Sequence, residues 1–307
     1  MQIAPQGEAD NVTDDLETEL ERCVIMPTML SYRHSFHAGN HADVLKHLVL
    51  VQLLRYFNQK GKPYWYIDTH AGAGCFALDS IHAKKNSEFE SGISRLWSHT
   101  DLPPEINDYL DQVKALNTSL LRRYPGSPLI ALQLMRPDDR LRLFELHSTD
   151  FKLLCDNLRD AGRRVAIVQS DGFADLKSVL PPPPRRGLTL IDPSYEDKRD
   201  YVRVIAAVKE AQSRFPTGTC MIWYPLLQRG DAHQLPEKLK KIAPDWLNVS
   251  VAIKAPSADG FGMHGSGLFI VNPPWTLAAL LRRTMPTIAQ LLAQDDSAAF
   301  NLEVAAA

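Results

Sequence analysis

Four acidic residues each follow a short apolar run of the chain, at positions suited to holding a small molecule. They are Asp68, Glu145, Asp171 and Asp192. When such runs form a parallel sheet covered by helices, ligands bind beyond the carboxyl ends of the strands. An acid after the second strand can accept both hydroxyls of a ribose, and an acid after the third is placed to accept from an adenine amine. The pattern predicts a site for an adenosine-containing cofactor.

A glycine-containing turn directly follows the first of these acids. Gly72 and Gly74 let the backbone approach a ligand closely, and with Ala77 they also fit a dinucleotide fingerprint. In a nicotinamide site, the ribose-binding acid lies about 20 residues further on, at the end of the next strand. Here the next strand ends only at Glu145. The spacing therefore favours S-adenosylmethionine, with S-adenosylhomocysteine as its product, over a nicotinamide.

The most informative tetrapeptide is Asp192-Pro193-Ser194-Tyr195. It resembles the Asp/Asn-Pro-Pro-aromatic motif of amino-group methyltransferases. An adenine amine is a poor nucleophile because its lone pair is delocalised into the ring. Hydrogen bonds from the amine to the Asp192 side chain and the Pro193 carbonyl would free that lone pair for attack on a sulfonium methyl group. Tyr195 is expected to stack on the extruded base. Ser194 departs from the usual proline, which puts the rate in question rather than the reaction.

A second match to the motif, Asn272-Pro273-Pro274-Trp275, is closer by letter. It follows the last strand, which in methyltransferase sheets is antiparallel, so its carboxyl end points away from the cofactor edge. We therefore favour Asp192 as the catalytic residue. Asn272 is interpreted as a strand-ending turn followed by a packed Trp275.

A histidine-rich stretch between Ser31 and His47 precedes the first predicted helix. His37 and His41 have the i, i+4 spacing of two metal ligands on a helix. No nearby glutamate or cysteine completes a ligand set, and Gly39-Asn40 interrupts a helix there. We expect no metal site.

The elements that must position these residues alternate along the chain. Apolar residues at helical spacing run from Val44 to Leu54, and further helices are expected near 88–98, 104–117 and 127–135, with Ser127 as a possible N-cap. Strands are expected at 64–68, 141–146, 165–168, 188–191, 219–224, 249–253 and 268–271. This alternation predicts an α/β, Rossmann-like fold with a mostly parallel, seven-stranded sheet.

Composition divides the chain further. Residues 1–28 hold seven acidic residues and one basic residue, which predicts a disordered acidic tail. The other residues carry a net charge of about +4, a weak indication of an anionic partner. The four cysteines are far apart, as expected for reduced thiols. No apolar run is long enough for a membrane span and no leader is recognisable. A cytoplasmic protein without membrane association is expected.

The whole pattern resembles one family, the ribosomal RNA large subunit methyltransferase J family, from Met29 to about Trp275. The resemblance rests on the Met29–His47 opening, the Asp68–Gly74 turn, Tyr124–Pro128, Glu145-Leu-His147, Asp171-Gly172, Asp192–Tyr195 and Asn272–Trp275. It implies a class I methyltransferase fold that methylates the N6 amine of an adenine in 23S ribosomal RNA.

The resemblance also implies roles for individual residues. It places Tyr32 and His34 at the target base and makes Asp192 catalytic. Its cofactor contacts are Lys46, His47, His70, Ser127, Glu145, Asp171 and Gly172, to which the strand-end pattern adds Asp68, Gly72, Gly74 and Asp192.

The predicted domain organisation combines these inferences. Residues 29–63 form the opening motif and a helix flanking the active site, and residues 64–75 and 141–285 form the methyltransferase domain. Residues 76–140 form an inserted small helical subdomain, and residues 286–307 a C-terminal helix and tail. A monomer is favoured.

Two alternatives stay open at this point. A DNA adenine-N6 methyltransferase would use the same chemistry, although 76–140 is small for a target-reading domain. A non-catalytic ribosomal RNA-binding protein with this fold would be supported only by Ser194. Such a protein would bind RNA equally well after Asp192→Ala and would transfer no methyl group.

Overall fold

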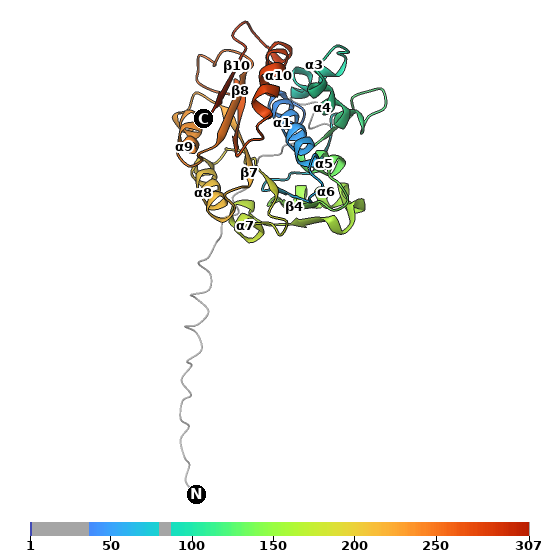
Figure 1. The fold of residues 1–307 in the computed structure, drawn as a ribbon, viewed down its shortest axis with the longest axis vertical. Coiled ribbons are helices and arrows are strands. Elements are labelled where there is room, and N and C mark those ends of the chain that lie inside the picture. The colour runs from blue at the N-terminus through green and yellow to red at the C-terminus, as the bar shows by residue number, and fades with distance from the viewer. Residues whose placement is uncertain (2–36, 80–86, 307) are drawn as a thin grey trace. The chain divides into compact units, whose positions relative to one another are not determined.

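The computed structural model describes residues 1, 37–79 and 87–306 of the 307-residue chain. Within this part, a central sheet of eight strands has the order β10-β8-β9-β7-β6-β1-β4-β5 (Figure 1). The strands are β1 (Trp65–Asp68), β4 (Arg140–Phe144), β5 (Val165–Val168), β6 (Gly187–Ile191), β7 (Thr219–Leu226), β8 (Trp246–Ala252), β9 (Gly265–Val271) and β10 (Ala299–Val304).

Five neighbouring strands, from β5 to β7, run parallel. β9 is antiparallel to both β7 and β8, as expected for the last strand of the predicted fold. This arrangement confirms the α/β fold with a mostly parallel sheet. Since β9 runs in the opposite direction, Asn272 at its end lies at the edge where the parallel strands begin, away from Asp192.

The sheet has eight strands instead of the predicted seven. The additional strand, β10, pairs antiparallel with β8 at the sheet edge, where Phe300 lies opposite Val251 and Leu302 opposite Val249. It falls in the segment that was expected to be a helix and a tail. A strand of six residues at an open sheet edge shows little alternation of apolar and polar residues. It can be recognised only from its pairing with the neighbouring strand.

Helices cover both faces of the sheet. α1 (His41–Asn58), α5 (Ser127–Leu134) and α10 (Leu277–Leu292) contribute to one hydrophobic core, whereas α7 (Gly172–Val179), α8 (Arg199–Arg214) and α9 (Gly230–Lys240) contribute to the other. α6 (Ser148–Asn157) follows β4, and the short η3 (Arg159–Arg164) leads into β5.

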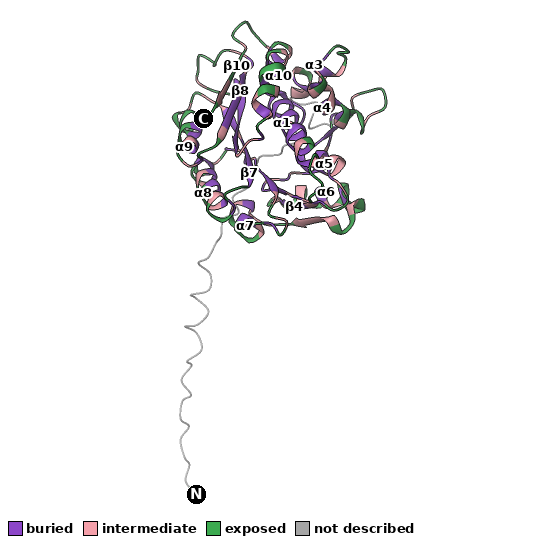
Figure 2. Ribbon diagram, in the orientation of Figure 1, coloured by how far each residue is buried: buried purple, intermediate pink, exposed green. Residues whose placement is uncertain are grey.

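α1 is the most enclosed of these helices. It is rich in apolar residues, as is typical of a helix packed inside a protein, and it is buried along almost its whole length (Figure 2). Asn40 begins it, because the Asn40 side chain accepts hydrogen bonds from the Ala42 and Asp43 amides. α1 thereby carries polar residues from its first turns into the interior.

The segment between β1 and β4 forms a separate layer beside α1. It contains a two-stranded sheet of β2 (Cys75–Ala77) and β3 (Arg123–Pro125), and the helices η2 (Glu88–Ser91), α3 (Ile93–Trp97) and α4 (Pro104–Lys114). α4 packs on α1, whereas α5 packs on β1, β4 and α1. None of the helices in residues 37–79 and 87–306 combines the length and apolar character of a membrane span.

Candidate functional site

The four strand-end acids lie along one edge of the sheet. Asp68 is the last residue of β1, Glu145 follows β4 directly, Asp171 begins α7 after β5, and Asp192 follows β6 directly. These strands are parallel neighbours, so their carboxyl ends share this edge. The structure therefore brings together the acids whose spacing predicted an adenosine site.

Glu145 is fixed by two backbone amides. The amide of Gly72 donates to Oε2 at 2.8 Å and that of His147 donates to Oε1 at 2.7 Å. Gly72 has a φ of 61° and Gly74 a φ of 76°, which glycine adopts without steric cost. Burial raises the pKa of Glu145 to about 7, despite these hydrogen bonds. Each carboxylate oxygen keeps a lone pair for a ribose hydroxyl.

Asp68 is completely buried under the glycine turn. Its Oδ2 accepts from the Tyr66 hydroxyl at 2.8 Å and from the Ser127 hydroxyl at 2.7 Å. Burial raises the pKa of Asp68 to about 6, against the lowering effect of these hydrogen bonds. Ser127 is the first residue of α5, and Gly126 occupies the N-cap position. The N-cap interpretation of Ser127 is therefore wrong, because its hydroxyl points to Asp68.

Asp171 and Gly172 connect β5 to α7. The Asp171 side chain accepts from the Phe173 amide at 3.0 Å and forms an ion pair with Arg203. A Cβ on Gly172 would overlap the backbone of Thr69, so only glycine fits this crossing of the two loops. His70 packs edge-on against Phe173, with ring centroids 4.7 Å apart, and burial lowers the pKa of His70 to about 3.

The centre of the edge is an ion-paired cluster around Lys46. The Lys46 Nζ atom lies 2.5 Å from Oδ2 of Asp192 and 2.9 Å from Oδ1 of Asp43. The side chain of Lys46 is 6% exposed and that of Asp192 13%. Burial lowers the pKa of Lys46, but the two carboxylates more than offset this and raise it above its usual value. Lys46 is thus a buried cation that holds Asp192 in place.

The loop after β6 folds Tyr195 into the protein. Tyr195 has a φ of 56°, is 2% exposed, and donates its hydroxyl to the Trp223 carbonyl at 2.7 Å. Its ring packs against Tyr201 and Trp223. This burial contradicts the expected stacking of Tyr195 on a target base. The positive φ turns the side chain inward, where it supports the loop that carries Asp192 and Pro193.

Residues 61–303 match the family described as ribosomal RNA large subunit methyltransferase D, RlmJ. The chain belongs to this family. It is 43% identical over 278 residues to ribosomal RNA large subunit methyltransferase J of Haemophilus influenzae, covering 90% of this chain and 98% of that protein. It is 45% identical over 260 residues to the protein of the same name from Escherichia coli K12, covering 84% and 92%.

A solved structure of a Legionella pneumophila protein has the same overall fold as this RlmJ family member. The two share 35% sequence identity with a TM-score of 0.82, covering 88% of this chain and 99% of the Legionella chain. Membership of the family confirms the resemblance inferred from the sequence.

Trp223 of β7 was missed by sequence reasoning. It borders the Lys46 cluster, since the Lys46 Nζ atom lies 5.9 Å from the centre of the Trp223 ring. The buried Trp223 Nε1 atom has no hydrogen-bond partner within residues 37–79 and 87–306. Its sequence signal is faint, since an aromatic residue inside a strand reads as core. Asp43 was also missed, although its i, i+3 spacing from Lys46 on a buried helix was a signal.

His47, next to Lys46 on α1, is buried. Its Nδ1 atom lies 2.8 Å from the Tyr124 hydroxyl, which bonds Tyr109 in turn. Its predicted contact with the cofactor stays a prediction. Tyr32 and His34, predicted at the target base, lie outside the described residues, as does the acidic tail 2–28.

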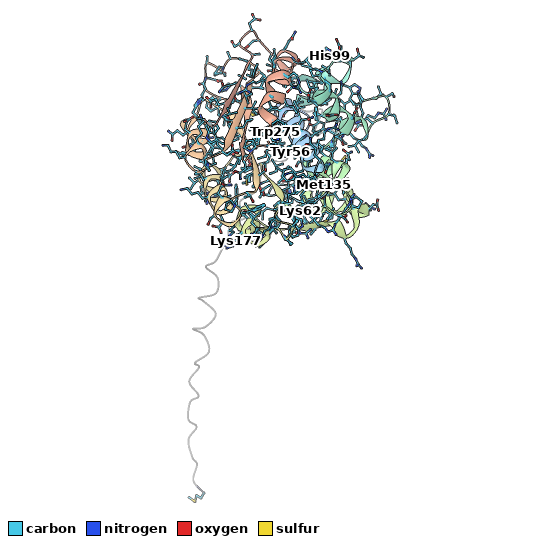
Figure 3. The ribbon with its side chains drawn as sticks, viewed as in Figure 1. Tyr56, Lys62, His99, Met135, Lys177 and Trp275 are labelled. Atoms are coloured by element: carbon cyan, nitrogen blue, oxygen red, sulfur yellow. The ribbon has the colours of Figure 1, made fainter. Side chains whose placement is uncertain are left out.

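Asn272 forms a turn, as its position predicted. It has a φ of 51°, and its side-chain amide donates to the carbonyls of Pro216 and Gly218, both at 2.7 Å. With its side chain bound to the segment before β7, Asn272 does not face the Lys46 cluster. Trp275 of the same motif, labelled in Figure 3, is 84% exposed, so the prediction of a packed tryptophan is wrong.

Proposed function

We propose that this protein transfers a methyl group from S-adenosylmethionine to the exocyclic N6 amine of an adenine in 23S ribosomal RNA. Its curated relatives are named ribosomal RNA large subunit methyltransferases. The observation that carries the proposal is the position of Asp192, which is held by Lys46 at the sheet edge beside Asp68, Glu145 and Asp171.

The residues at this edge fit the proposed cofactor. Glu145 is oriented by two backbone amides and suits a ribose, and Asp171 at the start of α7 suits an adenine amine. The turn through Gly72 and Gly74 leaves backbone close to the ligand. S-adenosylmethionine supplies the methyl group on a positively charged sulfonium. No group of three or more metal-ligating side chains was found in the described part of the chain.

Asp192 and Pro193 orient the target amine. Two hydrogen bonds from the amine, to the Asp192 carboxylate and the Pro193 carbonyl, favour a pyramidal nitrogen with an available lone pair. Charge in the Lys46 cluster supports the same step. The Asp192 carboxylate that accepts from the amine also stabilises the positive charge that develops on the amine nitrogen. The departing proton goes to Asp192 or to water.

Ser194 alters the loop without removing either acceptor. It is half-buried, and the positions of Asp192 and Pro193 are fixed by Lys46 on one side and by buried Tyr195 on the other. These two anchors supply stiffness that the usual proline would otherwise provide. A catalytic protein is therefore favoured over a non-catalytic RNA-binding protein.

The direct test uses S-adenosylmethionine with a labelled methyl group. The protein is incubated with unmodified 23S ribosomal RNA, with assembled large subunits and with duplex DNA, and each product is digested to nucleosides. We expect labelled N6-methyladenosine from RNA and none from DNA. Label only in DNA would favour the DNA methyltransferase alternative, and cofactor binding without any labelled product would favour the non-catalytic one.

A further inference from the structure

A cavity lies at the start of α1, the helix that also carries Lys46. It has a volume of about 330 Å³, within the usual size range of small-ligand pockets. α1 and the residues before it form one wall, η2 another, and the loop between β8 and β9 a third. The residues that line the cavity include His37, His41, Glu88, Lys254, Met263 and Gln294.

His41 gives this cavity an unused hydrogen-bonding group. The residue is 8% exposed, and its buried Nε2 atom has no hydrogen-bond partner among the described residues. Burial lowers the pKa of His41 to about 4, so the ring is neutral near pH 7. A neutral imidazole nitrogen can donate or accept one hydrogen bond, depending on its tautomer. A buried polar atom left in this state is suited to a ligand that supplies the missing partner.

The other polar groups of the wall are already arranged. Glu88 accepts from the Asn40 side chain and pairs with His37 Nδ1, both at 2.9 Å. The hydrogen bond to Glu88 raises the pKa of His37, and the more distant charge of Glu196 adds to this effect. Glu88 therefore orients the rim, and Lys254 supplies a cation in the same wall.

The β8–β9 loop presents an aromatic ring next to this wall. Phe261, two residues before Met263, is 79% exposed and stands between Gly260 and Gly262, which have φ values of 76° and 86°. The base of the loop is tied to the segment after α10, because the Ala255 amide donates to Asp295 at 2.9 Å. Within the loop, the Phe261 amide donates to Asp259 at 3.0 Å. An exposed aromatic ring of this kind can stack on a base.

The cavity is close to the proposed methyl-transfer site without being part of it. His41 precedes Lys46 by five residues on α1, a rise of about 7.5 Å along the helix. Lys46 contacts Asp192, and Glu196 of the same loop acts electrostatically on His37. A chain that places one nucleotide at Asp192 would bring a neighbouring nucleotide to this cavity.

We propose that the cavity and Phe261 bind a nucleotide adjacent to the target adenine in the RNA strand. The base edge bonds His41, the backbone phosphate lies near Lys254, and Phe261 stacks on a base. Single-stranded RNA is recognised by this combination of stacking, edge hydrogen bonds and cationic backbone contacts. The inference rests on the proposed function, and it adds a source of sequence preference outside the catalytic loop.

The test measures methylation of RNA fragments that contain the modified adenine. Each of the three nucleotides on either side is replaced in turn by an abasic one, and kcat/KM is compared for the wild type, His41→Ala, Lys254→Ala and Phe261→Ala. Two exposed residues provide matched controls, His99→Ala, labelled in Figure 3, and Lys209→Ala on α8.

For the wild type, we expect one neighbouring abasic position to lower kcat/KM about tenfold, the scale of one stacked base. His41→Ala and Phe261→Ala should lower kcat/KM on intact RNA by raising KM. In these variants the same abasic replacement should lower kcat/KM much less than in the wild type, because the side chain that contacts this base is already missing. Lys254→Ala should raise KM on every fragment. The controls should match the wild type.

If the abasic replacement lowers kcat/KM as much in both His41→Ala and Phe261→Ala as in the wild type, this inference is overturned and the proposed function is not. Phe261 is exposed, so its variant tests the inference even where His41→Ala affects folding. Absence of methyl transfer by the wild type to any intact RNA is a different result, which would overturn the proposed function itself.

Discussion

Lys46 and Asp192 form an ion pair of 2.5 Å between the first helix of the described chain and the loop after β6. The two residues are 146 positions apart, and both side chains are largely withdrawn from water. Asp43, one turn before Lys46, completes the cluster. α1 therefore does more than cover the sheet, because it sets the position of the carboxylate that we propose to orient the target amine.

Removing the cation should destabilise the protein as well as slow it. Lys46→Met leaves Asp43 and Asp192 without their shared partner, and breaking a buried ion pair costs about 3–5 kcal/mol of unfolding free energy. Urea unfolding monitored by circular dichroism measures this loss, with exposed Lys62→Met as the control. A change in unfolding free energy no larger than that of the control would show that the cluster does not hold the site together.

Gly172 should not tolerate a side chain. In Gly172→Ala the new methyl group would overlap the Thr69 backbone, which forces the β1 and β5 loops apart. We expect a lower melting temperature and at least a tenfold weaker affinity for S-adenosylhomocysteine, measured by calorimetry. In the control, Gly230→Ala, the added Cβ meets nothing within 4 Å. Equal affinities in the two variants would argue against a cofactor at this crossing.

Asn272 should matter for stability and not for the chemical step. Asn272→Ala removes the hydrogen bonds to the Pro216 and Gly218 carbonyls, each of which contributes about 0.5–1.5 kcal/mol. The turnover number of the folded variant should stay within twofold of the wild type. A large fall in turnover, with stability unchanged, would instead make Asn272 a catalytic candidate.

Glu145 should give the stability a recognisable pH dependence. Burial raises its pKa from 4.5 to about 7, so the folded protein binds this proton more tightly than the unfolded chain. The stabilisation from the proton is complete below pH 4.5 and is lost as the pH rises through 7. As the pH rises from 4.5 to 7, the unfolding free energy of the wild type should therefore fall relative to that of Glu145→Gln. A difference that stays constant or rises would contradict the raised pKa.

Much of this site was predictable because it follows the direction of the strands. Asp68, Glu145 and Asp192 each end or follow a short apolar run, and parallel strands bring such residues to one edge. The antiparallel direction of β9 likewise separated Asn272 from that edge, although its motif is the closer match by letter.

The remaining features depend on packing that no local pattern records. Tyr195 and Trp275 are both aromatic residues of similar motifs, yet one is buried and the other exposed, because the turn that carries each decides which way the ring points. The contact of Lys46 with Asp192 depends on how α1 crosses the sheet. β10 became recognisable only beside its partner β8.

The most direct test of the account is single-turnover methyl transfer by Asp192→Ala. The variant is compared with the wild type on unmodified 23S ribosomal RNA at saturating labelled S-adenosylmethionine, after circular dichroism and cofactor titration have shown that it is folded and loaded. We predict cofactor affinity within a few-fold of the wild type and no detectable N6-methyladenosine. Formation of N6-methyladenosine by the variant at near wild-type rate would contradict the central role given to Asp192.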